Sequence, residues 1–182
     1  MYEGHSYRWE SPRRAGNSAK LVEAVLEGAA ETGAETTIHY LGEKNIKPCT
    51  GCYTCESTKE CVISDDDMAE IYPDMESADA YVFASPVYFD QVSGQFKTFL
   101  DRIFPYYWGK PLKGRKAVFT LVYENPEEGL YGHVVDWFTD MMEICHGLDF
   151  VGTLKVHGTG KNPVAGNPEL QARARELGRK LT

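Results

Sequence analysis

The sequence predicts an α/β fold in which a parallel sheet lies between two layers of helices. Two short, continuous apolar runs, residues 80–84 and 116–122, are typical of strands that are covered on both faces. Amphipathic segments with helical spacing separate these runs, so that strands and helices alternate along the chain. This alternation indicates right-handed strand–helix–strand units, and therefore a parallel sheet.

The first strand is the weakest element of this pattern. Residues 4–10 stand where it belongs, but Tyr7 and Trp9 are their only large apolar side chains. A central strand that carries His5, Arg8 and Glu10 would bury charge at a cost of several kcal/mol. We therefore predict that this segment forms a poor, short or displaced first strand.

A helix and a second strand follow. Asn17 or Ser18 can cap the start of the helix, and Gly33 suits its end. Residues 35–41 are rich in β-branched and aromatic side chains, which favour a strand. The remaining elements are strands at 80–84, 116–122 and 150–154, and helices at about 65–75, 96–103, 134–142 and 170–181. Five strands and five helices predict the flavodoxin-like three-layer sandwich, a five-stranded parallel sheet of order 2-1-3-4-5 with helices on both faces.

Length and composition limit the alternatives. The 182 residues suit one domain, so we expect a single domain over 1–182 with a cysteine-rich loop insertion at about 44–64. A net charge of -8 argues against nucleic acid or an anionic membrane as the main partner. No apolar run is long enough to span a bilayer, and the N-terminus lacks the apolar segment of a signal peptide, so we expect a cytoplasmic location.

Four of the five cysteines lie within thirteen residues, at Cys49, Cys52, Cys55 and Cys61. A cubane iron–sulfur cluster needs four converging thiolates, which a tight loop with two-residue gaps can supply. Three alternatives remain open at this point: two disulfides, a tetrahedral zinc site, and reduced thiols without a ligand. We expect Cys145, the fifth cysteine, to be a small buried side chain.

Ligands in such sheets bind at the carboxyl ends of strands, which points to the loops 11–17, 85–92 and 123–129. The first loop precedes a helix N-terminus, where free backbone N–H groups and the helix dipole favour an anion. Its polar side chains suit a terminal phosphate: Ser11, Arg13, Asn17 and Ser18. The loop matches neither the Walker nor the G-x-G-x-x-G pattern, which disfavours a nucleoside triphosphate or a Rossmann-bound nicotinamide.

The second and third loops suit a planar ligand. Tyr88 and Phe89 can stack on it, and Tyr123, Glu124 and Asn125 can make polar contacts to its edge. On the third helix, we expect Lys97, Asp101 and Arg102 to form a solvated face or an ion pair.

Three motifs together resemble a known family. They are S-P-R-x-x-G-N-S at 11–18, K-P-C-T-G-C-Y-T-C-x5-C-V-I-S-D-D-D-M at 47–68, and S-P-V-Y-F-x-x-V-S-G-Q-F-K-x-F-L-D-R at 85–102. In this order they resemble the iron–sulfur flavoproteins, within the NAD(P)H-dependent FMN reductase and multimeric flavodoxin superfamily. The resemblance covers nearly the whole chain.

The resemblance implies a flavodoxin-like fold, a bound FMN, a [4Fe-4S] cluster and a homodimer or homotetramer. The implied FMN phosphate ligands are Ser11, Arg13, Asn17 and Ser18. The residues implied to line the ribityl chain and isoalloxazine are Pro86, Val87, Tyr88 and Phe89. The implied cluster ligands are Cys49, Cys52, Cys55 and Cys61.

The function expected from this resemblance is an FMN-dependent oxidoreductase that passes electrons between a small-molecule or protein donor and acceptor. The alternatives are a cluster-free NAD(P)H-dependent FMN or quinone reductase, and a non-catalytic cysteine-loop metal or redox sensor. One departure is Glu10, which stands where the family has a small turn residue. Its carboxylate would crowd and repel a phosphate, so we predict weakened FMN binding.

Overall fold

The computed structural model describes residues 5–10 and 14–182. Within these residues six strands form a sheet of order β2-β1-β3-β5-β6, and β4 pairs with β3 alone. The strands are β1 His5–Glu10, β2 Glu35–Tyr40, β3 Ala80–Tyr88, β4 Gln91–Val92, β5 Lys116–Val122 and β6 Asp149–Val156. All neighbours along the main path are parallel, whereas β4 is antiparallel to β3.

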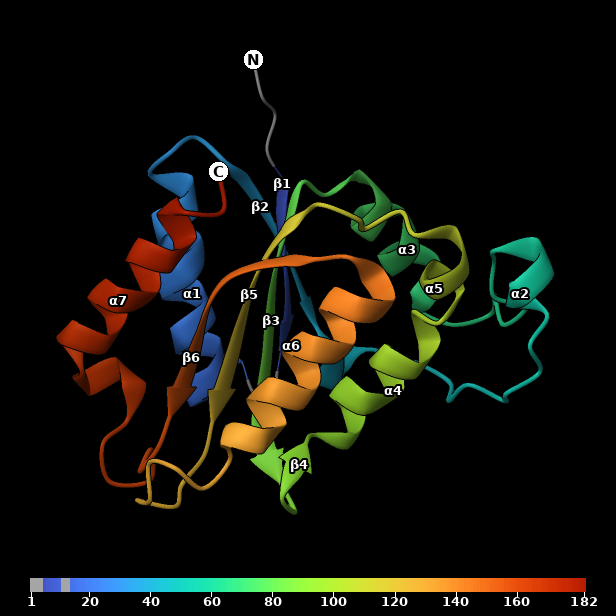
Figure 1. Ribbon diagram of the computed structural model, residues 1–182. Coiled ribbons are helices and arrows are strands. Elements are labelled where there is room, and N and C mark those ends of the chain that lie inside the picture. The colour runs from blue at the N-terminus through green and yellow to red at the C-terminus, as the bar shows by residue number, and fades with distance from the viewer. Residues whose placement is uncertain (1–4, 11–13) are drawn as a thin grey trace.

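Helices cover both faces of this sheet. Figure 1 shows α1 and α7 on one face and α3, α4 and α6 on the other. The α-helices are α1 Asn17–Ala30, α2 Cys55–Thr58, α3 Met68–Ser77, α4 Gly94–Arg102, α5 Pro105–Gly109, α6 Gly132–His146 and α7 Pro168–Arg179, and the short 3-10 helices are η1 Leu41–Glu43 and η2 Val164–Gly166. Each face has its own apolar core cluster. The predicted α/β class is therefore confirmed.

The prediction of a poor, short or displaced first strand is wrong. β1 lies between β2 and β3, and it pairs with β2 from His5↔Glu35 to Glu10↔Tyr40. It also pairs with β3 from Ser6 to Trp9. Ladder hydrogen bonds on both edges hold this strand although its composition is unfavourable, because strand formation depends on context more than on intrinsic propensity.

The segment predicted as a loop after residue 84 is largely strand. β3 continues to Tyr88, and a tight turn at Phe89 and Asp90 leads into β4. Both turn residues have left-handed backbone, with φ of 47° and 63°. Pro86 is tolerated because the described pairs between β1 and β3 end at Phe83, so its missing N–H interrupts no bond on that edge.

The start of α1 differs from the predicted capping. Gly16 is the N-cap, and Asn17 is already inside the helix. The Asn17 amide donates to the backbone oxygen of Thr159 at 3.4 Å and accepts from Val164 N–H at 2.9 Å. It therefore ties the helix start to the segment after β6. The turn after the helix contains Gly33 with φ of 94°, in agreement with the predicted end.

The helices α1 and α7 cross in backbone contact. A Cβ on Gly28 would lie 2.0 Å from the oxygen of Arg175, and one on Gly178 would lie 1.8 Å from the oxygen of Val25. Only glycine fits such a crossing. The ion pair between Arg175 and Glu27, at 2.6 Å, lies beside it. The crossing fixes the axis of α1, whose first turn faces the site described next.

Candidate functional site

A cavity of about 450 Å³ lies at the carboxyl ends of β3 and β5, beside the start of α1. This volume is typical of small-molecule sites. Nine residues that the sequence singled out line it: Asn17, Ser18, Pro86, Val87, Tyr88, Phe89, Tyr123, Glu124 and Asn125. Ser11 and Arg13, the other two, lie outside the described residues. Three loops that are far apart in the sequence therefore contribute to one cavity.

One end of the cavity is formed by the first turn of α1. Gly16, Asn17 and Ser18 line it, and Ser18 is buried. The first N–H groups of a helix have no intrahelical partner, and Gly16 has no side chain with which to cap them. Together with the dipole of a 14-residue helix, these groups can bind a phosphate.

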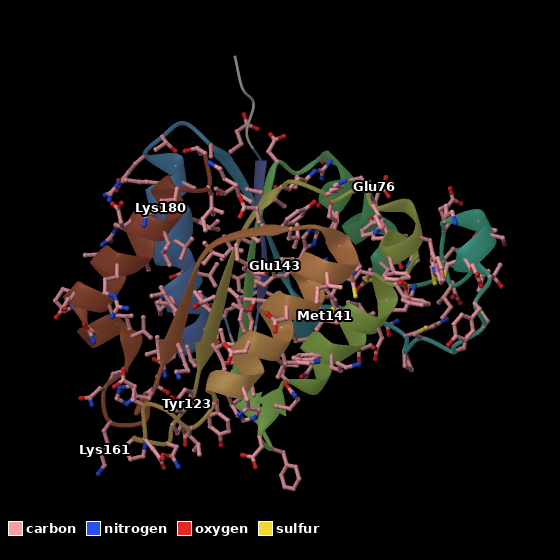
Figure 2. The ribbon with its side chains drawn as sticks, viewed as in Figure 1. Glu76, Tyr123, Met141, Glu143, Lys161 and Lys180 are labelled. Atoms are coloured by element: carbon pink, nitrogen blue, oxygen red, sulfur yellow. The ribbon has the colours of Figure 1, made fainter. Side chains whose placement is uncertain are left out.

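The other end is aromatic. Tyr123 is buried at the end of β5, where Figure 2 labels it, and its ring meets that of Tyr131 edge to face at 4.8 Å. Tyr88 is partly exposed, and Phe89 at the hairpin tip is fully exposed. These rings provide a surface for a flat ligand.

The hydroxyl of Tyr123 is only partly free to make the polar contact to a ligand that the sequence predicts. Its hydroxyl donates to the backbone oxygens of Glu127 and Glu128, at 3.1 and 2.6 Å. Its hydroxyl hydrogen is thus engaged within its own loop, and burial raises the pKa of Tyr123. Glu124 is exposed and lines the cavity.

Five cavity residues were not assigned a ligand contact from the sequence: Gly16, Asp90, Val122, Tyr131 and Thr159. Thr159 follows the last parallel strand, so the rule that ligands bind at strand carboxyl ends could have included its loop, but only the loops 11–17, 85–92 and 123–129 were predicted from that rule. Tyr131 stands immediately before α6 and lies outside every motif recognised in the sequence. It donates a hydrogen bond to Asp90, which raises the pKa of Tyr131.

The cysteine loop lies between η1 and α3 and projects beyond α4 and α5 (Figure 1). Its backbone is left-handed at Gly51, Tyr53 and Lys59, with φ of 67°, 58° and 62°. These turns wind the loop tightly. As a result Cys49, Cys52, Cys55 and Cys61 all line a second cavity, of about 540 Å³. Met141 of α6, labelled in Figure 2, lines the same cavity.

The chemistry of this donor set fits an iron–sulfur cluster. Burial raises the pKa of Cys55, and the charges of the other three thiols raise it further, which places all four within electrostatic range. The N–H of Gly51 donates to Cys49 Sγ at 3.4 Å, as amides do around cluster thiolates. Within the part of the chain that the structure describes, however, no group of three or more possible ligands is gathered closely enough to hold a metal ion.

Two expectations near this loop need correction. Cys145 is only partly buried and lines the same cavity as the other thiols, because it lies on the face of α6 that borders the loop. The ion pair between Lys97 and Asp101 is present at 2.5 Å. Arg102 does not belong to a solvated face, because its side chain is fully buried against the carboxylate of Asp66.

A twisted parallel sheet with helices on both faces and a cavity at its carboxyl edge defines a flavodoxin-like α/β protein. The chain belongs to the family of NADPH-dependent FMN reductases, whose model matches residues 10–151. None of the described helices is long and apolar enough to cross a membrane.

Curated relatives support the resemblance seen in the motifs. An iron–sulfur flavoprotein of Archaeoglobus fulgidus is 41% identical over 121 residues, which is 65% of this chain and 54% of the relative. Another, from Methanocaldococcus jannaschii, is 41% identical over 105 residues, 58% of this chain and 54% of the relative. The chain thus spans about half the length of the curated relatives it matches.

A solved structure supports the fold. The NAD(P)H:quinone oxidoreductase from Methanothermobacter marburgensis superposes with a TM-score of 0.73 at 22% identity. The match covers 99% of this chain and 100% of that chain. The flavodoxin-like α/β fold expected from the sequence is therefore confirmed.

Proposed function

We propose that the protein is an FMN-dependent oxidoreductase of the iron–sulfur flavoprotein type. It consists of one domain over 1–182, with strand order 2-1-3-4-5 and a cysteine-rich insertion at about 44–64. The observation that supports this most strongly is the convergence of nine sequence-selected residues from three loops on one cavity at the sheet edge.

In this proposal the chain holds FMN along the cavity. The backbone N–H groups at Asn17 and Ser18, together with Ser11 and Arg13, bind the phosphate. The segment Pro86–Phe89 lines the ribityl chain and the isoalloxazine, while Tyr123 and Glu124 lie at its edge. The side chains of Tyr88 and Phe89 would cover one side of the isoalloxazine ring system. When bound, FMN supplies one-electron and two-electron redox chemistry.

The cysteine loop would hold a [4Fe-4S] cluster through Cys49, Cys52, Cys55 and Cys61. When bound, such a cluster supplies one-electron transfer at a potential set by its surroundings. The protein would work in the cytoplasm as a homodimer or homotetramer, in which symmetry-related cysteine loops lie near the interface. Its electron donor and acceptor would be small molecules or redox proteins.

A second candidate is a cluster-free NAD(P)H-dependent FMN or quinone reductase on the same fold. The observation in its favour is that the described thiols line one cavity without forming a closed ligand group. A third, non-catalytic candidate is a metal or redox sensor built on the cysteine loop. The visible spectrum of anaerobically purified protein separates these functions: flavin bands with a broad cluster shoulder, flavin bands alone, or no colour.

Titration of apo-protein with FMN tests the main proposal. We expect quenching of flavin fluorescence with a dissociation constant in the micromolar range or below. Glu10→Gly should tighten binding by removing bulk and negative charge, with the larger gain at low ionic strength. Absence of quenching at tens of micromolar protein would contradict the proposal, and weaker binding by Glu10→Gly would contradict the role given to Glu10.

Anaerobic reconstitution with iron and sulfide tests the cluster. We expect about four irons per chain in the wild type, since a cubane cluster contains four. Cys52→Ser should abolish this uptake. Cys145→Ser is the matched control and should leave it unchanged, although Cys145 borders the same cavity. Equal uptake by both variants would contradict the ligand assignment.

A further inference from the structure

The buried guanidinium of Arg102 contacts both ends of the cysteine loop. Its Nη1 donates to the backbone oxygen of Lys47 at 2.8 Å, and its Nη2 donates to that of Ile63 at 2.8 Å. These two residues flank the segment 49–61 that carries the four thiols. Arg102, at the end of α4, therefore holds together the two chain segments at which the loop begins and ends.

Asp66 completes this arrangement. Its carboxylate pairs with Arg102, and both side chains are fully buried. It also accepts from the backbone N–H of Lys47 at 2.9 Å and from that of Met68 at 3.1 Å. Burial alone would raise the pKa of Asp66, but the hydrogen bonds from Arg102, Lys47 and Met68 lower it, so the carboxylate stays ionised. Lys47, at the start of the loop, is thus bonded through both its N–H, to Asp66, and its carbonyl oxygen, to Arg102.

A third contact joins α3 to this network. The hydroxyl of Tyr72 donates to the backbone oxygen of Arg102 at 2.5 Å. Tyr72 and Cys61 also border the same small cavity. Tyr72 therefore bonds the residue that holds both ends of the loop, and it does so beside a cavity that Cys61 lines.

The composition of this network requires arginine. Its planar fork makes four bonds at once, two to the carboxylate and one to each carbonyl, whereas a lysine ammonium has only three donors and no fixed planar geometry. Arg102 Nε nevertheless has no hydrogen-bond partner among the described residues. A buried N–H without a partner costs free energy, so such a residue merits an explanation beyond packing.

We propose that Arg102, paired with Asp66, is a positioning residue that holds the cysteine loop in the conformation in which its four thiols face one cavity. Its role is to preorganise the ligand set, because a metal centre needs its ligands held by a rigid supporting shell. The positioning of the loop does not depend on the proposed function, whereas its consequence for cluster assembly rests on it.

Hydrogen–deuterium exchange on the full chain, reduced and without added iron, tests the positioning directly. We expect Arg102→Lys to speed amide exchange in residues 47–63 by about tenfold or more, while the amides of β5 keep their wild-type rates. Asp66→Asn should act in the same direction. It keeps the shape of the side chain, so it also serves if Arg102→Lys folds poorly.

Arg115→Lys is the matched control. Arg115 donates to the backbone oxygens of Met75 and Glu76, each at 2.8 Å, but contacts no cysteine and neither end of the loop. This variant should leave exchange in 47–63 unchanged. Unchanged exchange in both Arg102→Lys and Asp66→Asn, or an equal increase in 47–63 and in β5, would overturn the positioning role, since the second result describes only global destabilisation.

Iron uptake provides the second readout. If the wild type assembles about four irons per chain, Arg102→Lys should assemble fewer than about one, whereas Arg115→Lys should match the wild type. If the wild type assembles none while the exchange result holds, the proposed cluster fails and the positioning role stands. If Arg102→Lys assembles the full cluster, the positioning role is overturned even where its exchange is faster.

Discussion

The hydroxyl of Tyr131 donates a hydrogen bond of 2.7 Å to the carboxylate of Asp90. Tyr131 stands at the start of α6, and Asp90 at the tip of the hairpin between β3 and β4. Both line the cavity proposed to bind FMN. One side-chain bond therefore closes the rim of this cavity between two elements that are far apart in the sequence.

Tyr131→Phe should weaken FMN binding by about threefold to tenfold, because the hairpin tip loses its anchor and must be ordered by the ligand. Fluorescence titration of apo-protein measures this change. Tyr107→Phe is the control, since Tyr107 lies beside the cysteine loop instead. Identical dissociation constants for Tyr131→Phe and wild type would show that the bond does not shape the binding site.

Asp66→Ala should lower the free energy of unfolding by about 3–5 kcal/mol, because it leaves the buried charge of Arg102 without its partner. Asp101→Ala removes a carboxylate whose partner, Lys97, is exposed, and should cost less than about 1 kcal/mol. Urea unfolding of both variants measures the difference. A loss below about 1 kcal/mol for Asp66→Ala would mean that water reaches Arg102.

Gly178→Ala should destabilise the protein by about 1–3 kcal/mol or more, because the added methyl group meets the backbone of α1 and forces the two helices apart. Gly166→Ala introduces the same group where no atom lies within 4 Å, and should be nearly neutral. Thermal unfolding distinguishes them. Since α1 also carries the proposed phosphate site, Gly178→Ala should weaken FMN binding as well; equal melting temperatures for both variants would contradict the close crossing.

Acid should destabilise the protein through His146. Burial, together with the smaller effect of the charge of Lys110, lowers the pKa of His146 from 6.5 to about 4. Between these values the unfolded chain binds a proton that the folded chain does not, so stability is fully present above pH 6.5 and falls as the pH drops towards 4. The loss can reach about 3 kcal/mol, at about 1.4 kcal/mol per pH unit.

Unfolding free energies measured between pH 7 and pH 4 check this dependence. His146→Gln should flatten the slope of stability against pH in that window, although His39, whose pKa is also lowered by burial, still contributes in the same direction. A variant that keeps the full wild-type slope would show that His146 takes up its proton without opening the fold.

Most of the fold could be predicted from local patterns. The apolar run at 116–122 became β5 with the same bounds, because a strand covered on both faces leaves a continuous signal. β1 could not be recognised in this way, since charged residues interrupt its apolar pattern and its backbone pairing with β2 and β3 is seen only in the fold. The hairpin at Phe89 was missed for a similar reason: left-handed residues other than glycine carry no sequence signal of their own.

The candidate site shows the same difference between residues with a local sequence signal and residues whose position depends on distant parts of the chain. Residues in short motifs, such as Pro86 and Tyr88, could be assigned to a cavity because the strand order places their loop at its edge. Arg102 could not be separated from its exposed neighbour Asp101 by spacing alone. Its burial depends on Asp66, which lies 36 residues away in the sequence and meets it only in the folded chain.

The cysteine loop leaves and rejoins the body of the protein at nearly the same point. Asn45 N–H donates to the carboxylate of Asp67 at 2.7 Å, and Asp67 N–H donates to the oxygen of Asn45 at 3.1 Å. Because these two residues are already joined, lengthening or shortening the segment between them changes the loop-closure entropy only slowly. This segment can therefore be exchanged for another of different length, with or without the proposed cluster ligands, while the sheet and the cavity proposed for FMN stay unchanged.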